Sequence, residues 1–212
     1  MAKPFFSVII ATYNREDFIF RALKSLVSQT ETDWEALVID DGSTDGTFSR
    51  IQPFLDRYCS IKYSLQIHKG MVAAKNAGIL MSEGKFLTFL DSDDEFHPLH
   101  LESRKAILEE NEEIKFLYGR VKILGNPYVP DRFNLTKLVH LDQCVIGGNF
   151  FIDRESANAL KGFRNITLGT DADLFDRVKN LGVHMMEVVL PTYIYHHELH
   201  DSITNKLAER AR

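Results

Sequence analysis

The hydrophobic positions of this chain follow two spacings, one typical of buried strands and one of amphipathic helices. Short apolar runs that predict parallel strands occupy 6–11, 34–39 and 85–90, and a run of alternating character that predicts a further strand occupies 61–67. Helical spacing occupies 17–29, 46–58, 71–81 and 98–110. Strand and helix therefore alternate through the first half. This order predicts right-handed crossovers and an open, mostly parallel sheet flanked by helices, which is an α/β fold.

The second half has a weaker pattern. We expect further strands at 116–123, 145–152, 183–189 and 192–195, and a helix at 171–181. Residues 125–131 are rich in turn formers. With no linker or repeat in view, the sequence predicts a single domain over 1–204 and a short charged tail at 205–212.

Composition narrows the class of protein. A length of 212 residues suits one domain, and 44% hydrophobic and 26% charged residues are ordinary for a globular protein. A net charge of −5 disfavours nucleic acid as the main partner. No apolar run approaches the roughly 20 residues that span a bilayer, so we expect no transmembrane segment. We expect a cytoplasmic protein whose cysteines, Cys59 and Cys144, are reduced thiols.

The most informative stretch is the acidic run after the apolar strand at 85–90. Asp91, Asp93 and Asp94 lie within four positions. Carboxylates this close repel one another and hold protons unless a cation neutralises them. Hard oxygen ligands suit Mg²⁺ or Mn²⁺, and Mg²⁺ is usually shared with substrate phosphates. The run therefore predicts a divalent cation and a nucleotide-diphosphate substrate.

Polar residues also follow two other strands, at Thr12-Tyr13 and at Asp40-Asp41. In a parallel sheet, ligands bind outside the carboxyl ends of the strands. Tyr13 could stack on a base, and either Asp40 or Asp41 could accept from a base N–H. Asp91 could hold the ribose and Asp93 a metal. The alternative for 41–47 is a plain turn and helix cap, since Gly, Ser and Asp favour both.

At this point the chain resembles glycosyltransferase family 2, which has the GT-A fold. The resemblance rests on four segments that follow one another at 7–14, 38–45, 70–78 and 91–93. It covers about 6–204. It implies a nucleotide-binding half at about 1–115 and a smaller antiparallel acceptor-binding half at 116–204.

The resemblance also implies roles for single residues. Thr12, Tyr13 and Asp41 would lie at the nucleotide, Asp91 near the ribose, and Asp93 would be a metal ligand. Lys75 stands where the family usually has Arg. It keeps the positive charge for the nucleotide but loses bidentate phosphate geometry.

The catalytic base is expected in the second half. Residues 169–174 resemble the family's Glu-Asp pair at a helix start, which makes Asp171 the base. The alternative is a carboxylate that complements the helix dipole. Asp173 would face elsewhere on the helix. Gly147-Gly148-Asn149 either lets the backbone approach a sugar or forms a strand bulge.

His197 and His200 both remain candidates to complete the metal shell, against the alternative of surface histidines without a role. The resemblance thus implies a metal-dependent, inverting transfer of a sugar from a nucleotide-diphosphate sugar to a hydroxyl. By resemblance the donor is a UDP-sugar, the metal Mn²⁺ or Mg²⁺, and the acceptor a carbohydrate or glycolipid of a bacterial surface glycan.

Three alternatives stay open at this stage. Peripheral association with the inner face of a membrane is compatible with the sequence. A nucleotidyltransferase would use a metal and a similar sheet but would attack phosphorus. A nucleotide-sugar binding module would keep the donor site without catalysis.

Overall fold

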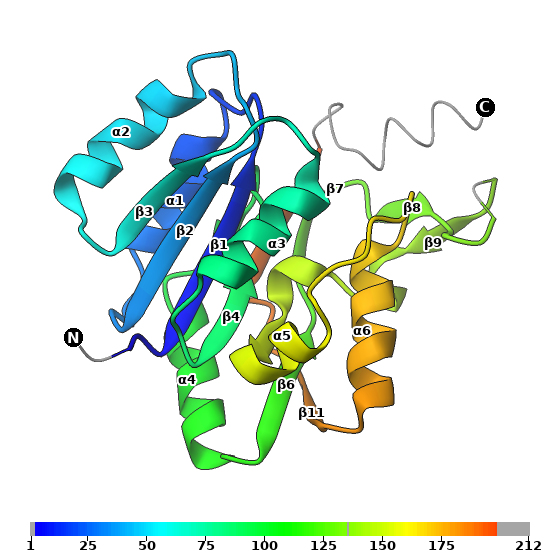
Figure 1. The fold of residues 1–212 in the computed structure, drawn as a ribbon. Helices are drawn as coiled ribbons and strands as arrows, with labels where there is room; N and C mark the ends of the chain where they lie inside the picture. Colours follow the sequence, from blue (N-terminus) through cyan, green and yellow to red (C-terminus); the bar gives the residue numbers. More distant parts are fainter. Residues whose placement is uncertain (1–2, 135, 199–212) are drawn as a thin grey trace.

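A seven-stranded sheet forms the centre of the molecule, and a computed structural model describes it over residues 3–134 and 136–198 (Figure 1). Its strand order is β11-β6-β10-β4-β1-β2-β3. The strands are β1 (Phe6–Thr12), β2 (Trp34–Asp40), β3 (Ile61–Leu65), β4 (Phe86–Phe89), β6 (Ile114–Gly119), β10 (Phe151–Asp153) and β11 (His184–Val188). Strand β10 runs antiparallel to both neighbours, and the other adjacent pairs of this sheet are parallel. The predicted mostly parallel α/β sheet is confirmed.

Helices cover both faces of the sheet. They are α1 (Ile19–Val27), α2 (Thr47–Arg57), α3 (Met71–Met81), α4 (His100–Glu110), α5 (Arg154–Ala159) and α6 (Thr170–Leu181). Alternation along β1 sends Val8 and Ile10 into the core with α1, α2 and α4, and Ile9 into the core with α3, α5 and α6. Because both faces are covered, the central strands are continuous apolar runs. No helix within the described residues has both the length and the apolar character needed to cross a bilayer.

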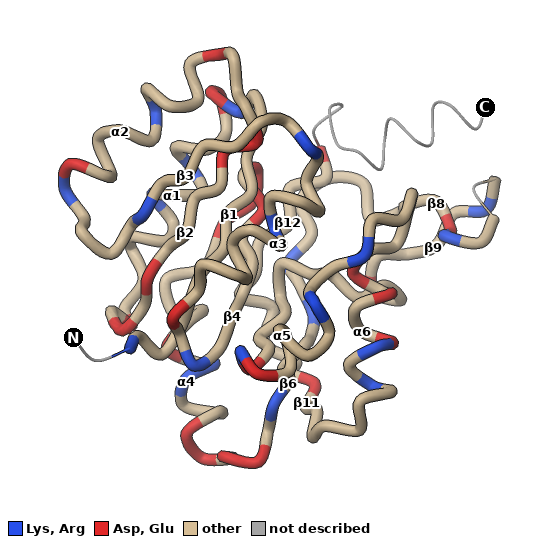
Figure 2. Tube along the Cα trace, in the orientation of Figure 1, with Lys and Arg blue, Asp and Glu red and all other residues tan. Residues whose placement is uncertain are grey.

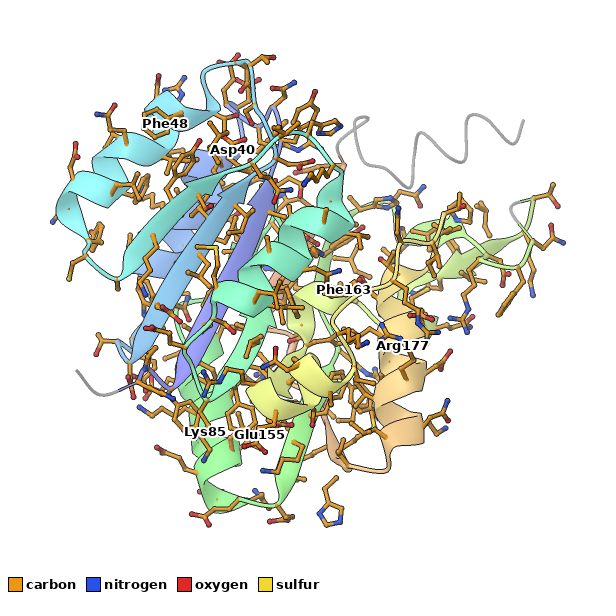
Figure 3. All side chains as sticks on the ribbon, viewed as in Figure 1. Asp40, Phe48, Lys85, Glu155, Phe163 and Arg177 are labelled. Carbon is orange, nitrogen blue, oxygen red and sulfur yellow. The ribbon has the colours of Figure 1, made fainter. Side chains whose placement is uncertain are left out.

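The carboxyl ends of the parallel strands lie at one edge of the sheet. Thr12 at the end of β1 pairs in register with Asp40 at the end of β2. Figure 3 shows Asp40 at this edge, and Lys85 and Glu155 near the opposite one. Because β10 is antiparallel, its first residue, Phe151, also faces the Asp40 edge, and the turn before it joins the strand ends there.

Two smaller sheets complete the second half. One has the order β5-β12-β7, formed by β5 (Glu95–Phe96), β12 (Tyr193–His197) and β7 (Lys122–Gly125). The other is a hairpin of β8 (Tyr128–Pro130) and β9 (Leu138–His140), which projects from the body in Figure 1. Strand β12 is antiparallel to β5 but parallel to β7. Pairing in the second half, which we expected to be antiparallel, is therefore mixed.

Two expected strands are wrong in their extent. The run 116–123 divides into β6 and β7, which belong to different sheets. It breaks at Gly119, where a side chain would overlap the carbonyl of Val188. In 145–152 only the last two residues are strand, because Gly147–Asn149 form a 3₁₀ turn, η2. Short elements without a long periodic pattern, β5, α5 and the hairpin, were not expected at all.

Helix α3 lies unusually close to the sheet because of Gly78. A Cβ at this position would overlap the Cγ2 of Ile9, which is fully buried on β1. The close approach packs α3 against β1 and β2, and from there the Lys75 side chain reaches Asp91 after β4. Gly78 therefore helps to place a charged side chain at the edge where the strands end.

We predict that Gly78→Ala destabilises the fold. In an open helix Ala would stabilise by about 1 kcal/mol relative to Gly, but overpacking a core costs about 1–3 kcal/mol. Because Ile9 is fully buried and has no room to move aside, we expect a cost in the upper part of the overpacking range, and the free energy of unfolding in urea should fall by roughly 1–2 kcal/mol net of the helix gain. Leu80→Ala on the same helix is the matched control, because Leu80 is 81% exposed and its truncation should change little. A Gly78→Ala protein as stable as the parent would contradict this packing.

Candidate active site

The loop after β4 carries more negative charge than its surroundings neutralise. Asp94 is buried and accepts hydrogen bonds from the Tyr193 O–H at 2.7 Å and from the His196 N–H at 2.7 Å. Burial, followed by the charges of Asp91 and Asp93, raises the pKa of Asp94 well above its ordinary value. Burial and the charge of Asp91 also raise the pKa of Asp93. Acidic positions gather beside β1 in Figure 2. Such a loop is suited to receive a cation.

One protein cation already lies against this loop. The Nζ of Lys75 is 2.8 Å from Oδ1 of Asp91, and its side chain is 3% exposed. Burial opposes the charge, but Asp91 and Asp171 hold the pKa of Lys75 above its ordinary value. Its Nζ also lies 5.5 Å from the ring centroid of Phe163, which Figure 3 labels. Lys75 therefore stays charged and links the β4 loop to the start of α6. Its expected contact with the nucleotide stays a prediction.

Asp171 lies in the first turn of α6 and faces this cation. Its Oδ2 accepts from the N–H of Gly147 at 2.9 Å, and a Cβ on Gly147 would come within 2.6 Å of the carboxyl. Burial raises the pKa of Asp171, the charge of Asp91 adds to this, and Lys75 opposes it. The missing side chain at Gly147 thus permits a close approach of the Asp171 carboxyl, whereas the sequence suggested the approach of a sugar or a strand bulge. A raised pKa suits a carboxyl that accepts a proton near neutral pH.

Asp173 is turned away from Asp171, as expected. Its carboxylate accepts from Arg177 at 2.8 Å and lies 3.5 Å from Arg164. These contacts tie α6 to the segment before it. Of the two carboxylates, only Asp171 lies beside Lys75.

The second strand end forms a rigid polar corner around Asp41. This buried carboxylate accepts from the Lys69 N–H at 2.9 Å and the Gly70 N–H at 2.7 Å. Burial opposes ionisation, but bonds from the Gln66 side chain and from these two N–H groups hold the pKa of Asp41 below its ordinary value. The corner therefore keeps a fixed negative charge beneath the segment that leads into α3.

An exposed aromatic surface lies above this corner. The rings of Tyr13 and His68 are stacked with centroids 4.0 Å apart, and Nδ1 of His68 is 2.8 Å from Oδ2 of Asp41. Tyr13 is 40% exposed, so its ring is available for stacking. That a base stacks there stays a prediction.

Asp40 and Thr12 are buried at the same edge. The carboxylate of Asp40 accepts from the Ser43 N–H at 2.8 Å and from the Tyr63 O–H at 2.9 Å. Because Asp40 and Asp41 are both buried, a base N–H would reach either carboxylate only after neighbouring atoms moved. Within the described residues the Thr12 hydroxyl has no hydrogen-bond partner. The structure thus gathers these expected nucleotide residues at one edge, with Asp40 engaged in its own turn.

Of the two histidines expected as metal ligands, only His197 can be described, since His200 lies outside the described residues. His197 is 2% exposed, its Nδ1 contacts the carbonyl of Asn126, and its Nε2 is buried without a partner in the described part of the chain. No three His, Cys, Asp or Glu side chains of residues 3–134 and 136–198 are grouped to hold a metal. Asp93 and His197 therefore remain separate candidates.

Arg104, on α4, is a structural residue of the site that sequence reasoning missed, and it holds Asn149 of the Gly147–Asn149 segment. The guanidinium of Arg104 is buried, and burial lowers its pKa to about 10. It donates to the Leu190 carbonyl at 2.9 Å and to the side chain of Asn149 at 3.4 Å. Asn149 in turn donates to the carbonyl of Arg120 at 2.8 Å. This network fixes η2, which presents the Gly147 N–H to Asp171. Arg104 lies within an ordinary helical pattern, so no local signal marked it.

A family model agrees with this arrangement. The model described as "Glycosyl transferase family 2" matches residues 7–160. This match includes the loop after β4 and ends before α6, the helix that carries Asp171.

Curated relatives share part of the chain. The Escherichia coli enzyme WfgD, "UDP-Glc:alpha-D-GlcNAc-diphosphoundecaprenol beta-1,3-glucosyltransferase", is 33% identical over 66% of this chain and 56% of its own length. The Bacillus subtilis "Putative teichuronic acid biosynthesis glycosyltransferase TuaG" is 30% identical over 75% of this chain and 66% of its own. An "Uncharacterized glycosyltransferase" of Rickettsia conorii is 42% identical over 50% of this chain but 17% of its own length. The chain thus spans only part of these relatives.

Solved structures share the fold. Staphylococcus aureus TarS 1-349 in complex with UDP-GlcNAc matches with a TM-score of 0.79 and 22% identity, covering 95% of this chain and 60% of TarS 1-349. The Pyrobaculum calidifontis mannosyltransferase PcManGT, in complex with GDP-Man and Mn²⁺, matches with a TM-score of 0.70 and 17% identity, covering 92% and 57%. These likenesses confirm the expected GT-A fold.

We predict that Lys75→Met destabilises the fold in a pH-dependent way. Removing one partner from a buried ion pair costs on the order of 3 kcal/mol. Without the cation, the pKa of Asp171 would rise further above its ordinary value. A carboxyl with a raised folded-state pKa carries its full destabilising effect above that pKa, and the effect is lost progressively as pH falls from there toward the ordinary pKa of the unfolded chain. The deficit in unfolding free energy should therefore shrink as pH falls from about 8 to about 5.

The matched control is Lys122→Met, an exposed cation on β7. Urea unfolding of both variants and the parent at the two pH values gives the comparison. If the loss of unfolding free energy in Lys75→Met is the same at both pH values, or no larger than the loss in Lys122→Met, then Lys75 does not balance the charges of Asp91 and Asp171.

Proposed function

This chain belongs to glycosyltransferase family 2, and from that membership we propose that it transfers a sugar from a nucleotide-diphosphate sugar, with UDP as the nucleotide, to a hydroxyl acceptor with inversion. The observation that carries the proposal is the meeting of two groups at one sheet edge. Asp91 of the β4 loop and Asp171 of α6 share the buried cation Lys75. Asp91 would face the donor, and Asp171 would accept the proton.

The nucleotide would occupy the strand ends. Tyr13 offers an exposed ring for the base, and the fixed charge of Asp41 lies beside it. Asp91, whose side chain is 30% exposed, can accept from ribose hydroxyls. Thr12 has a hydroxyl free of partners within the described residues. Two proteins of similar fold, TarS and PcManGT, were solved in complex with UDP-GlcNAc and GDP-Man, which supports a nucleotide-sugar as the donor.

The residues also fit a divalent metal. Burial and the charge of Asp91 raise the pKa of Asp93, which a bound cation would reverse, and the buried Nε2 of His197 lacks a partner among the described residues. Asp93 and one of His197 or His200 would hold Mn²⁺ or Mg²⁺, with phosphate oxygens completing the shell. When bound, the metal would supply a Lewis acid that neutralises charge on the departing diphosphate.

Asp171 would act as the base of a single displacement. The acceptor oxygen forms a bond to the anomeric carbon while the bond from that carbon to the diphosphate oxygen breaks. The hydroxyl proton passes to Asp171, and the nucleoside diphosphate leaves with the electron pair. Attack from the face opposite the leaving group inverts the anomeric centre. Lys75 and the Gly147 N–H hold the carboxyl in place for this transfer.

The acceptor would be a carbohydrate or glycolipid of a bacterial surface glycan. The name of WfgD gives a diphosphoundecaprenol-linked sugar as its acceptor, and TuaG is named as a putative glycosyltransferase of teichuronic acid biosynthesis. Such acceptors would bring the chain to the inner face of the cytoplasmic membrane.

We predict that Asp171→Asn lowers turnover by about 10²–10⁴-fold while nucleotide affinity is retained, because an amide cannot accept the proton. The assay measures nucleoside diphosphate released from UDP-Glc, UDP-GlcNAc or GDP-Man with membrane glycolipid extracts as acceptors. Asp176→Asn, an exposed carboxylate further along α6, is the control and should retain parental turnover. Parental turnover in Asp171→Asn would refute the base assignment. Pyrophosphate as the product would indicate a nucleotidyltransferase.

We also predict that Mn²⁺ strengthens UDP binding through Asp93. Calorimetric titration should show at least about a tenfold gain, or about 1.4 kcal/mol, over chelator-treated protein. Asp93→Asn should remove this gain and keep the metal-free affinity. Asp33→Asn, an exposed carboxylate at the other edge of the sheet, should keep the gain. The metal assignment fails if the gain survives in Asp93→Asn or is absent from the parent. UDP binding with no transfer to any acceptor would instead indicate a binding module.

A further inference from the structure

A cavity of about 160 Å³ lies beside the candidate active site, where β6 and β11 end. The segment containing η1 (Leu141–Gln143) covers it, and the link from β6 to β7 forms another wall. Since a water molecule occupies about 30 Å³ of liquid, the space equals about five waters. Such a volume suits one small ring. Because β6 and β11 are parallel to β4, the cavity opens at the same edge as the β4 loop.

Continuous backbone joins the cavity to Asp171. Cys144 and Ile146 line the cavity, and the next residue, Gly147, donates its N–H to the Asp171 carboxylate at 2.9 Å. On the other wall, the carbonyl of Arg120 accepts from Asn149 of the same turn. A molecule in the cavity would therefore lie one turn of chain from the candidate base.

The chemistry of the lining is that of a sugar site. Leu141 and Ile146 are buried and give an apolar floor. Arg120, Gln143 and Glu187 stand exposed around the opening, and none of these side chains has a hydrogen-bond or ion-pair partner among residues 3–134 and 136–198. A cation, an amide and a carboxylate together offer donors and acceptors with little net charge.

Other ligand classes fit less well. A phosphate group would meet the carboxylates of Glu187 and Asp142 on the same lining. A lipid chain would leave the polar groups at the opening unpaired, which costs free energy. Sugar hydroxyls both donate and accept, and the carbon face of a sugar ring can cover the apolar floor. The aromatic ring of Tyr118 adds to the wall.

We propose that this cavity binds one neutral sugar ring of the acceptor, next to the ring whose hydroxyl is glycosylated. The proposal rests on the proposed function and assigns its acceptor to the carbohydrates. The Glu187 carboxylate accepts from ring hydroxyls, and the Gln143 amide donates to them. Leu141 and Ile146 contact the ring carbons. The site therefore selects an acceptor of at least two sugar units, which extends from the cavity beside β11 toward Asp171.

Saturation-transfer NMR with methyl glycosides of neutral hexoses and N-acetylhexosamines tests the site without a known acceptor. At least one glycoside should bind the parent chain. Glu187→Ala and Gln143→Ala should each weaken its binding by roughly tenfold, the effect of losing a net hydrogen bond of about 1–1.5 kcal/mol. Glu112→Ala, an exposed carboxylate in the loop before β6, is the control and should bind as the parent does.

The proposal is overturned if no glycoside binds the parent, or if binding is unchanged in both Glu187→Ala and Gln143→Ala. UDP titration of the same variants separates this result from the proposed function. Both variants should bind UDP as the parent does, because Gln143 lies in η1 and Glu187 on β11, away from the ends of β1, β2 and β4 that would hold the nucleotide. If the parent fails to bind UDP, the proposed function is in error, while the glycoside result still reports on the cavity.

Discussion

The balance of buried charge around Lys75 is the constraint on which the site depends. One ammonium group lies against Asp91 and close to Asp171, and the loop that it touches also carries Asp93 and Asp94. Arg15 and Arg21 act against the rise in the pKa of Asp93, but burial and the charge of Asp91 still raise it, so these cations together do not neutralise the four carboxylates. The excess negative charge is stable only because Asp94 is hydrogen-bonded to Tyr193 and His196 and because the remaining carboxyls have raised pKa values or exposure to solvent. The site is therefore poised to take up positive charge.

The fold creates this imbalance through its topology. Parallel strands bring the ends of β1, β2 and β4 to one edge, and the antiparallel β10 adds the turn η2 from the second half. Gly147 then brings Asp171 of α6 to the same place. Asp91 and the candidate base Asp171 thus come from segments about eighty positions apart, and the sheet together with the turn η2 brings them to one place.

Sequence reasoning succeeded where the signal was periodic. The alternation of apolar runs and helical spacing identified the first four parallel strands and the helices between them, because burial on both sheet faces leaves a strong pattern. Polar residues at strand ends pointed to Asp91, Asp93 and Asp41. Asp171 was found only through a family resemblance. No pattern in one chain reveals that residue 171 faces residue 75.

The failures have physical causes as well. Residues 116–123 are mostly apolar, with Arg120 and Lys122 placed as the exposed positions of a strand would be, and nothing local marks the change of sheet that close packing of Gly119 on Val188 requires. The turn at Gly147–Asn149 is fixed by tertiary contacts to Asp171, Tyr193 and Arg104, so its apolar neighbours misled us into a strand. The cavity by η1 depends on segments that carried no periodic signal.

The most direct measurement of the central claim is a crystal structure with UDP and Mn²⁺, using anomalous scattering to locate the metal. The account predicts an anomalous peak bound by Asp93 in the β4 loop, the diphosphate beside it, and the uracil on the Tyr13 ring. A peak or a diphosphate away from the edge where Tyr13, Asp91 and Asp171 meet would contradict it.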